Sequence, residues 1–172
     1  MRNVSRILPL LPGIAMLSGC NNAAQKSNGQ NDQKPNIIYI FADDLGIGDL
    51  SCYGATKVST PNIDRLAGQG VQFTNAYATS ATSTPSRFGL LTGMYPWRQK
   101  NTGIAPGNSE LIIDTACVTM ADMLKDAGYA TGAVGKWHLG LGPKGGTDFN
   151  KQITPNAQSI GFDYEFIIPA TV

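Results

Sequence analysis

Two kinds of apolar pattern alternate along the chain, and together they predict an α/β fold. Apolar runs of strand length occur at residues 37–42, 129–134 and 161–168. Segments with a capping residue and an apolar helical face occur at residues 60–67 and 118–127. This alternation favours a mixed, largely parallel sheet that is flanked by helices.

The two helical segments carry start and stop signals. Thr60 is a candidate N-cap, and Pro61 suits the first helical position. In the second segment, Thr119 and Asp122 approximate a capping box, and Gly128 ends the helix. Both helices are therefore expected to be well defined at their ends.

The first 19 residues predict an export signal rather than part of the fold. Two arginines precede an apolar stretch at residues 7–17, which is shorter than the roughly 20 residues that a membrane span needs. The signal ends in Leu-Ser-Gly, followed by Cys20. Residues 20–34 are rich in Asn, Gln, Ser and Gly and predict a flexible tether, which leaves residues 35–172 for one small domain.

Charge and cysteine content exclude little except a nucleic-acid partner. The net charge is +1, and removing the signal with its two arginines leaves 11 basic and 12 acidic residues, or −1. No basic stripe of the kind that binds nucleic acid is present in the sequence. Cys52 and Cys117 are expected to be buried free thiols, although export would also permit a disulfide.

The segment around Ser83 is the first candidate for chemistry. Pro85 suits the first turn of a helix, so Ser83 lies at or just before a helix N-terminus, where backbone N–H groups favour an anion. Arg87 follows four residues later, and one helical turn brings its guanidinium back towards Ser83. The alternative is an ordinary capped helix with Arg87 on its surface.

A pair of carboxylates ends the first apolar run. Asp43 and Asp44 are followed by a glycine turn, at the kind of strand end where α/β proteins bind ligands. Adjacent carboxylates supply hard oxygen ligands, which suit Ca²⁺ or Mg²⁺. The alternative is a solvated surface turn.

Lys136 and His138 follow the second apolar run. They are two residues apart, so an extended backbone directs both side chains to the same side. An ammonium and an imidazole together suit an anion, and an imidazole also transfers protons near neutral pH. The alternative is a solvated lysine and a structural histidine.

Taken in order, these three segments resemble the signatures of the type I sulfatases. Residues 83–87 match S/C-x-P-S-R and are followed by the expected Thr-Gly, and residues 135–140 read G-K-W-H-L-G. The strand with its aspartate pair also resembles the opening of that family, and the resemblance runs from about residue 36 to about residue 166. The chain is thereby identified as a member of the family, which implies an alkaline phosphatase-like fold.

The resemblance also implies a mechanism and the residues that carry it. In this family a maturase, of the radical type for a serine signature, oxidises the first signature residue to formylglycine, whose hydrate attacks sulfur. Ser83 is then the formylglycine precursor, and Asp43 and Asp44 hold Ca²⁺ together with the modified Ser83. The substrates implied are sulfated glycans or aryl sulfates. The implied catalytic residues are Ser83, Arg87, Lys136 and His138.

The chain is short for this family, and we expect it to be the N-terminal portion of a catalytic domain, inactive by itself. The later Asp-Asn calcium ligands of the family, and its second lysine and histidine, have no counterpart in the sequence. A truncated or degenerate non-catalytic surface lipoprotein is one alternative. A phosphoester hydrolase of the same superfamily, with an unmodified hydroxyl nucleophile, is another, although the Pro-Ser-Arg after residue 84 argues against it.

The end of the export signal predicts a location. Leu-Ser-Gly-Cys resembles the bacterial lipobox, in which Cys20 becomes the acylated N-terminus and anchors the protein to a membrane. We therefore expect an exported bacterial lipoprotein of the periplasm or outer membrane. The alternative is a plain secretory signal that ends near a cysteine.

Overall fold

The computed structural model describes residues 34–170, and the chain divides into two units between Phe41 and Ala42. The export signal, Cys20 and nearly all of the tether lie outside the described residues. The helices and strands described here all belong to the second unit, which the following paragraphs concern unless stated otherwise.

A two-stranded parallel sheet forms the centre of this unit. β1 (Gly132–Lys136) pairs with β2 (Tyr164–Ile168), with Gly132 opposite Tyr164 and Lys136 opposite Ile168. Parallel pairing agrees with the largely parallel sheet that was predicted, although the connection between these two strands contains a short 3-10 helix and no α-helix. Both strands begin three residues later than the apolar runs that predicted them.

Three α-helices accompany the sheet. The capping box predicted at the start of the third is confirmed, since Thr119 Oγ1 accepts from Asp122 N and Asp122 Oδ2 accepts from Thr119 N. Thr60 does occupy the N-cap position of the first helix, but its side chain makes no capping bond and pairs with Ser51 and Asp64 instead. The helices are α1 (Pro61–Gln69), α2 (Ser83–Thr92) and α3 (Met120–Asp126), and the short 3-10 helices are η1 (Ile47–Asp49), η2 (Ser51–Tyr53), η3 (Pro96–Arg98) and η4 (Ala157–Ile160).

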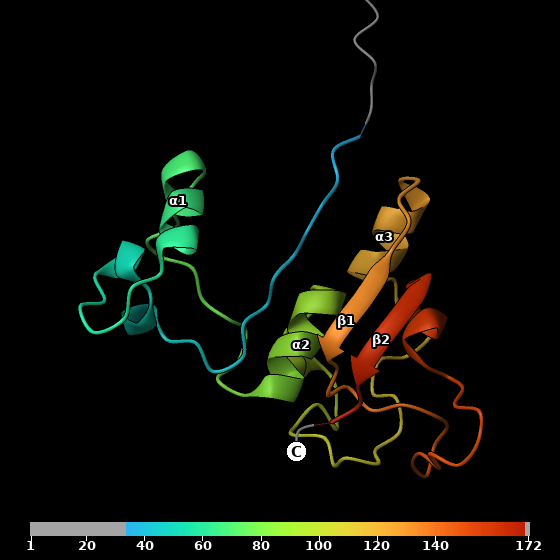
Figure 1. Cartoon of the computed structure of the whole chain (residues 1–172). Helices are drawn as coiled ribbons and strands as arrows, with labels where there is room; N and C mark the ends of the chain where they lie inside the picture. Colours follow the sequence, from blue (N-terminus) through green and yellow to red (C-terminus); the bar gives the residue numbers. More distant parts are fainter. Residues whose placement is uncertain (1–33, 171–172) are drawn as a thin grey trace, which may run out of the picture. The chain divides into compact units, whose positions relative to one another are not determined.

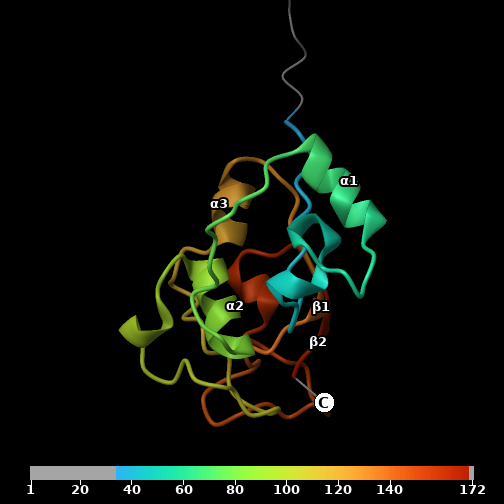
Figure 2. The same cartoon turned by 90° about the vertical axis from the view of Figure 1, so that its left-hand side faces the viewer.

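The hydrophobic core lies on one face of the sheet. α2 and α3 lie together on that side, as the two perpendicular views show (Figures 1 and 2). Ala133 and Ile167 pack against the core, whereas Val134 and Phe166 on the opposite face are 75% and 72% exposed. The buried apolar side chains of the core are those of Phe88, Leu91, Ile113, Trp137, Leu139, Leu141, Ala157 and Ile160.

The strand expected at residues 37–42 is absent, and that prediction was wrong. This segment is irregular, and Ile38 and Ile40 are 85% and 82% exposed. An apolar run becomes a strand only where a neighbouring strand pairs with its backbone. Among the described residues, β1 and β2 pair only with each other.

A second backbone pairing fixes the segment that follows β1. Residues 109–112 run beside residues 139–142, with Ile112 N donating to Leu139 O and Leu141 N donating to Ser109 O. Gly140 has φ +67°, and a Cβ there would lie 1.8 Å from the carbonyl oxygen of Glu110. Glycine is therefore required at position 140 by both backbone conformation and space.

The remaining expectations on the fold concern the cysteines and the membrane. Cys52 and Cys117 are both free, as expected, but they are only partly buried. Burial raises the pKa of the Cys117 thiol, and Asp114 and Asp122 nearby raise it further. Within residues 34–170, no helix has the length and apolar character needed to cross a membrane.

Candidate active site

Helix α2 positions Ser83 at its first residue. Thr82 precedes it as an N-cap with extended backbone, and Pro85 lies in the first turn, where its missing N–H leaves no intrahelical bond unmade. Gly93, with φ +66°, ends the helix and returns its N–H to Gly89 O. The helix is therefore as predicted, with Ser83 at the end that favours negative charge.

Arg87 reaches back over one helical turn to Ser83, which confirms the predicted contact. Its Nε donates to Ser83 Oγ at 3.0 Å, and its Nη1 donates to the carbonyl oxygen of Lys136 at 2.7 Å. The side chain is only 11% exposed. Arg87 thus joins the start of α2 to the end of β1 and does not project from the surface.

His138 is hydrogen-bonded through both ring nitrogens. Its Nε2 lies 3.0 Å from the carbonyl oxygen of Ala105, and its Nδ1 lies 3.0 Å from Ser83 Oγ. A carbonyl oxygen only accepts, so Nε2 carries a proton; in a neutral ring Nδ1 is then the acceptor that faces the Ser83 hydroxyl. The hydroxyl group at position 83 therefore lies within hydrogen-bond distance of a candidate base, and a backbone carbonyl orients that base.

The sequence predicts an extended backbone at His138, but the structure shows a different conformation. Its φ is +54°, so the residue is left-handed rather than extended. Lys136 and His138 nevertheless both belong to the group around Ser83. Their convergence comes from the turn that follows β1 and not from two extended residues of a strand.

Thr84 supports this arrangement and was missed by the sequence analysis. It is fully buried, donates from Oγ1 to the His138 carbonyl oxygen at 2.9 Å, and accepts from Ala105 N at 3.1 Å. The threonine therefore holds the two segments that bracket the imidazole. No side-chain signal marks Ala105, because its contribution is made by the backbone.

Asp43 faces two cations at the edge of the same group. Its Oδ2 lies 2.5 Å from Lys136 Nζ, and its Oδ1 lies 3.4 Å from Arg87 Nη2. The hydrogen bond from Lys136 lowers the pKa of the Asp43 carboxyl, and the charges of Lys136 and Arg87 lower it further. The structure thus brings Asp43, Ser83, Arg87, Lys136 and His138 together, which we call the Ser83 cluster.

Asp44 does not join the Ser83 cluster. It is exposed with φ +54°, and within residues 34–170 no hydrogen bond or ion pair connects it to the other predicted site residues. No group of three or more His, Cys, Asp or Glu side chains is placed for metal binding in the described part of the chain. The oxygen donors at Asp43, Asp44 and Ser83 still fit Ca²⁺ in kind, but they are fewer than the six to eight that it takes.

A comparison with models of known protein families assigns the chain to one of them. The sulfatase model matches residues 35–168, which include all of the Ser83 cluster. The chain belongs to the sulfatase family. The α/β fragment with a parallel sheet agrees with the fold of sulfatases of known structure, so the predicted fold class is confirmed.

Individual sulfatases resemble the chain over much of its length. It is 91% identical over 172 residues to the N-acetylgalactosamine-6-O-sulfatase of Bacteroides thetaiotaomicron, covering all of this chain and 34% of that enzyme. A solved structure concerned with the metabolism of multiple glycosaminoglycans by the same species matches with TM-score 0.80 and 95% identity, over 81% of this chain and 29% of that one. A further solved structure, in complex with its substrate D-glucosamine-2-N,6-O-disulfate, matches with TM-score 0.54 and 38% identity, over 62% and 21%. The chain thus spans about a third of the length of these relatives or less.

Proposed function

We propose that this chain supplies the nucleophile and much of the anion-binding apparatus of a sulfuric ester hydrolase. The observation that carries the proposal is the environment of Ser83 Oγ, which lies 3.0 Å from both His138 Nδ1 and Arg87 Nε. A nucleophile, a base and a fixed cation are thereby held at one helix N-terminus. Lys136 adds a second cation to the same cluster.

Each residue of the Ser83 cluster has a role in this proposal. If position 83 carries formylglycine, its hydrate would supply two hydroxyl groups, one as the nucleophile towards sulfur and one whose deprotonation would release the sulfate. His138 accepts protons at Nδ1 from the group at position 83. Arg87 and Lys136 stabilise the negative charge on the sulfate oxygens. The sulfate ester and one water are converted to the free alcohol and hydrogen sulfate.

The proposal includes Ca²⁺, which we place next to Asp43 and Asp44. Both carboxylates and the group at position 83 supply oxygen ligands of the kind that calcium prefers. When bound, the ion supplies positive charge beside the sulfate. Asp43 would then exchange its contact with Lys136 for the metal, which leaves the ammonium group available to the substrate.

The substrate we propose is a sulfated glycan, specifically one with 6-sulfated N-acetylgalactosamine. The N-acetylgalactosamine-6-O-sulfatase that is 91% identical over the whole chain motivates this choice. The relative in complex with a disulfated glucosamine supports sulfated amino sugars more generally. Aryl sulfates remain useful as simple test substrates for the same bond cleavage.

We also propose that the protein is an exported lipoprotein matured by a radical-type enzyme. Leu-Ser-Gly-Cys at the end of the signal motivates acylation at Cys20, and the Ser-type signature at Ser83 motivates the maturase. The two-electron oxidation of the Ser83 side chain delivers its electrons to that maturase. Release of a Cys20→Ala variant from the membrane fraction would support the anchor, and equal partition of both forms would contradict it.

The experiment uses a hybrid protein, in which this chain is joined to the remaining residues of the 91% identical enzyme. After co-expression with a radical maturase, the tryptic peptide 66–87 should lose the mass of two hydrogens. Ser83→Ala should lower the rate of sulfate release by a factor of about 10³ or more, as loss of a nucleophile does in other hydrolases. Ser80→Ala, outside the signature, is the matched control and should retain activity. A chelator should inactivate the hybrid, and full activity in excess chelator would contradict the calcium proposal.

One observation favours a second candidate. The unmodified Ser83 Oγ already lies 3.0 Å from His138 Nδ1, as a hydroxyl nucleophile does from its base. A phosphoester hydrolase would use that pair directly. Turnover by hybrid protein from a host without a maturase, with Ser83 unmodified by mass, would replace the formylglycine mechanism by this one. A hybrid that binds sulfated glycans but hydrolyses neither ester would instead favour the non-catalytic lipoprotein.

A further inference from the structure

The turn that follows α2 presents two aromatic rings to solvent. Tyr95 and Trp97 flank the first residue of η3, and their rings are stacked, with centroids 4.1 Å apart and planes 16° from parallel. Trp97 is 71% exposed and Tyr95 is 51% exposed. The outer face of the indole ring is therefore open to a ligand. We call residues 95–100 the aromatic turn.

Buried contacts hold the aromatic turn in place beneath these rings. Pro96 is buried, and its carbonyl oxygen accepts from the buried Thr102 Oγ1 at 2.6 Å. Gln99 Nε2 donates to the Ile112 carbonyl oxygen at 2.7 Å. A turn that is fixed in this way loses little conformational entropy when a ligand binds to it.

The same turn carries two cations. Arg98 and Lys100 are exposed, and neither side chain forms a hydrogen bond or an ion pair within residues 34–170. The sequence between Asp64 and Glu110 contains no acidic residue. The charge of this stretch is therefore positive, and a ligand with repeated negative charges is attracted to it.

Aromatic and cationic groups in one turn suit an anionic sugar chain. The electron-rich face of an indole attracts the C–H groups on one face of a sugar ring, which carry partial positive charge. Guanidinium and ammonium groups bind sulfate or carboxylate substituents. The Trp97 Nε1–H and the Tyr95 hydroxyl have no hydrogen-bond partner in the described structure, so both can bond to sugar hydroxyls.

The aromatic turn is separate from the Ser83 cluster. Ser83 begins α2, the turn follows the other end of that helix, and ten helical residues span about 15 Å. In the part of the chain that the structure describes, no hydrogen bond, ion pair or ring contact joins a side chain of the turn to a side chain of the cluster. A ligand on the turn is thus held away from the proposed nucleophile.

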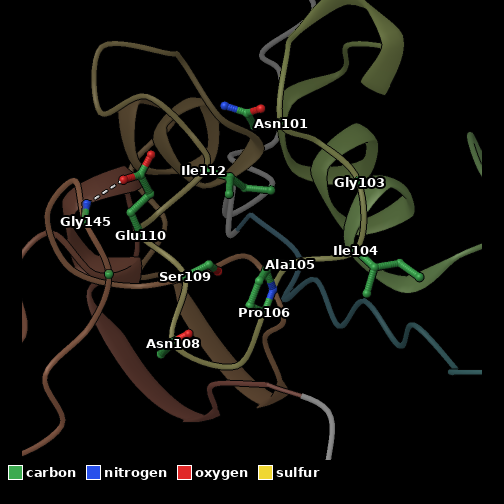
Figure 3. Close-up of a pocket in the computed structure, with 11 residues that line it drawn as sticks. Asn101, Gly103, Ile104, Ala105, Pro106, Asn108, Ser109, Glu110, Ile112 and Gly145 are labelled. Carbon is green, nitrogen blue, oxygen red and sulfur yellow. Dashed lines mark hydrogen bonds between the residues drawn. The ribbon is translucent and has the colours of Figure 1, made fainter.

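The cavity that follows the turn in the chain does not suit an anion. It has a volume of about 440 Å³, and residues 101–112 supply most of its lining (Figure 3). The one charged side chain among its described lining residues is that of Glu110, whose Oε2 accepts from Gly145 N at 2.8 Å. That carboxylate repels a negatively charged ligand. The aromatic turn is therefore the better site for an anionic chain.

We propose that the aromatic turn is a second glycan-binding site, which holds an anionic sugar chain without cleaving it. Trp97 stacks on one sugar ring, and Arg98 and Lys100 bind sulfate or carboxylate groups of that ring or of the next one. The site goes beyond the proposed function, because it binds a part of the polymer other than the ester that is hydrolysed.

The experiment measures binding to the hybrid protein with Ser83→Ala, which keeps the sugar chain intact. The probes are chondroitin 6-sulfate, which carries a sulfate and a carboxylate in each repeat, and neutral dextran. Titration calorimetry gives the dissociation constants. The two variants compared with this protein are Trp97→Ala and the double variant Arg98→Gln with Lys100→Gln.

Matched controls make the same chemical changes outside the aromatic turn. Tyr77→Ala removes a ring that is 87% exposed. The double variant Lys57→Gln with Arg65→Gln removes two exposed cations. Neither control should change the affinity for either probe.

The expected result is a loss of affinity for the anionic chain alone. Trp97→Ala should weaken the binding of chondroitin 6-sulfate about tenfold, as loss of an aromatic anchor does at other interfaces. The double charge variant should weaken it by a similar factor at low salt and by less in about 0.5 M salt, because salt screens exposed charges. Dextran should bind far more weakly than chondroitin 6-sulfate. Unchanged affinity in the charge variant would overturn the inference even if Trp97→Ala failed to fold.

A membrane surface is the competing partner, since aromatic and basic side chains also bind anionic lipid. The hybrid without its export signal is therefore sedimented with vesicles of phosphatidylethanolamine and phosphatidylglycerol in equal amounts. Sedimentation that Trp97→Ala abolishes, together with unchanged glycan affinity in that variant, would overturn the inference in favour of a membrane-binding surface. Glycan binding that depends on Trp97 supports it whatever the vesicles show.

Turnover of 4-nitrophenyl sulfate by the hybrid with Ser83 intact separates this inference from the proposed function. Trp97→Ala should leave that turnover unchanged, because the aryl substrate has no sugar. If the hybrid hydrolyses no ester but binds the glycan in a Trp97-dependent manner, the proposed function fails and the glycan site stands. If the ester is hydrolysed but neither turn variant weakens glycan binding, the glycan site fails and the proposed function stands.

Discussion

Helices α1 and α2 have nearly the same length but are held in place by different interactions. α2 has ten residues, six of them buried, whereas none of the nine residues of α1 is buried. Phe88 of α2 is fully buried in the core, while Leu66 of α1 is 62% exposed. The helix that carries the proposed nucleophile is thus the one that packs in the core.

α1 is held by polar contacts around one carboxylate. Asp64 accepts from Ser51 Oγ at 2.6 Å, from Cys52 N at 2.9 Å and from Thr60 Oγ1 at 3.0 Å. These contacts are only partly buried, and each contributes modestly, because folding exchanges a hydrogen bond to water for one within the protein. An amphipathic pattern therefore marks a helix face, but the rest of the fold decides whether that face is buried.

The largest difference between the two helices should appear when an apolar side chain is truncated in each. Phe88→Ala should lower the free energy of unfolding by about 3–5 kcal/mol, because it removes a fully buried ring and leaves a cavity. Leu66→Ala should change it by about 0.5 kcal/mol or less, since that side chain is mostly exposed. Urea denaturation of both variants measures the two values. Equal losses would show that α1 is packed as tightly as α2.

A smaller but more local effect is expected from the buried hydroxyl of α2. Thr84→Val keeps the shape of the side chain but leaves the His138 carbonyl and Ala105 N–H without their buried partner, at a cost of about 1–3 kcal/mol. Sulfate release by the hybrid should fall with it, because both segments around the imidazole loosen. Thr82→Val is the control, since Thr82 is exposed and makes no side-chain capping bond. Unchanged kinetics of the Thr84→Val variant would show that Thr84 does not support the position of the imidazole.

The same contrast explains how far the sequence predicted the site. Arg87 meets Ser83 because both lie on one helix, where the spacing of four residues fixes the contact. The capping box of α3 is equally local. Such features depend on neighbours in the sequence, so their patterns are visible in it. The catalytic roles assigned through the family resemblance remain predictions.

Contacts between distant segments could not be predicted in this way. Thr84, Ala105 and His138 are joined by bonds that involve backbone atoms, and no residue type is required for those atoms. The cavity beside them is built on a loop with no recognisable motif. The prediction of a strand near residue 40 was wrong for a related reason, because strand formation depends on a partner elsewhere in the chain.

The smallest expected effect concerns pH and distinguishes the two helices without a change in the core. The hydrogen bond from Ser51 lowers the pKa of Asp64, and the bonds from Thr60 and Cys52 N act in the same direction. Because the folded pKa is lower than the unfolded value of about 3.9, this stabilisation is complete well above that value and is lost as the pH falls through the folded pKa. α1 should therefore lose protection from hydrogen exchange as the pH falls from 5 to about 3, after correction for intrinsic rates. α2 contains no carboxylate and is held by the core, so its protection should fall less.

Asp64→Asn should lower the protection of α1 at pH 5 and remove most of its pH dependence. An equal pH dependence in α1 of that variant would assign the effect to other groups and would end the contrast between a helix held by one carboxylate and a helix held by the core.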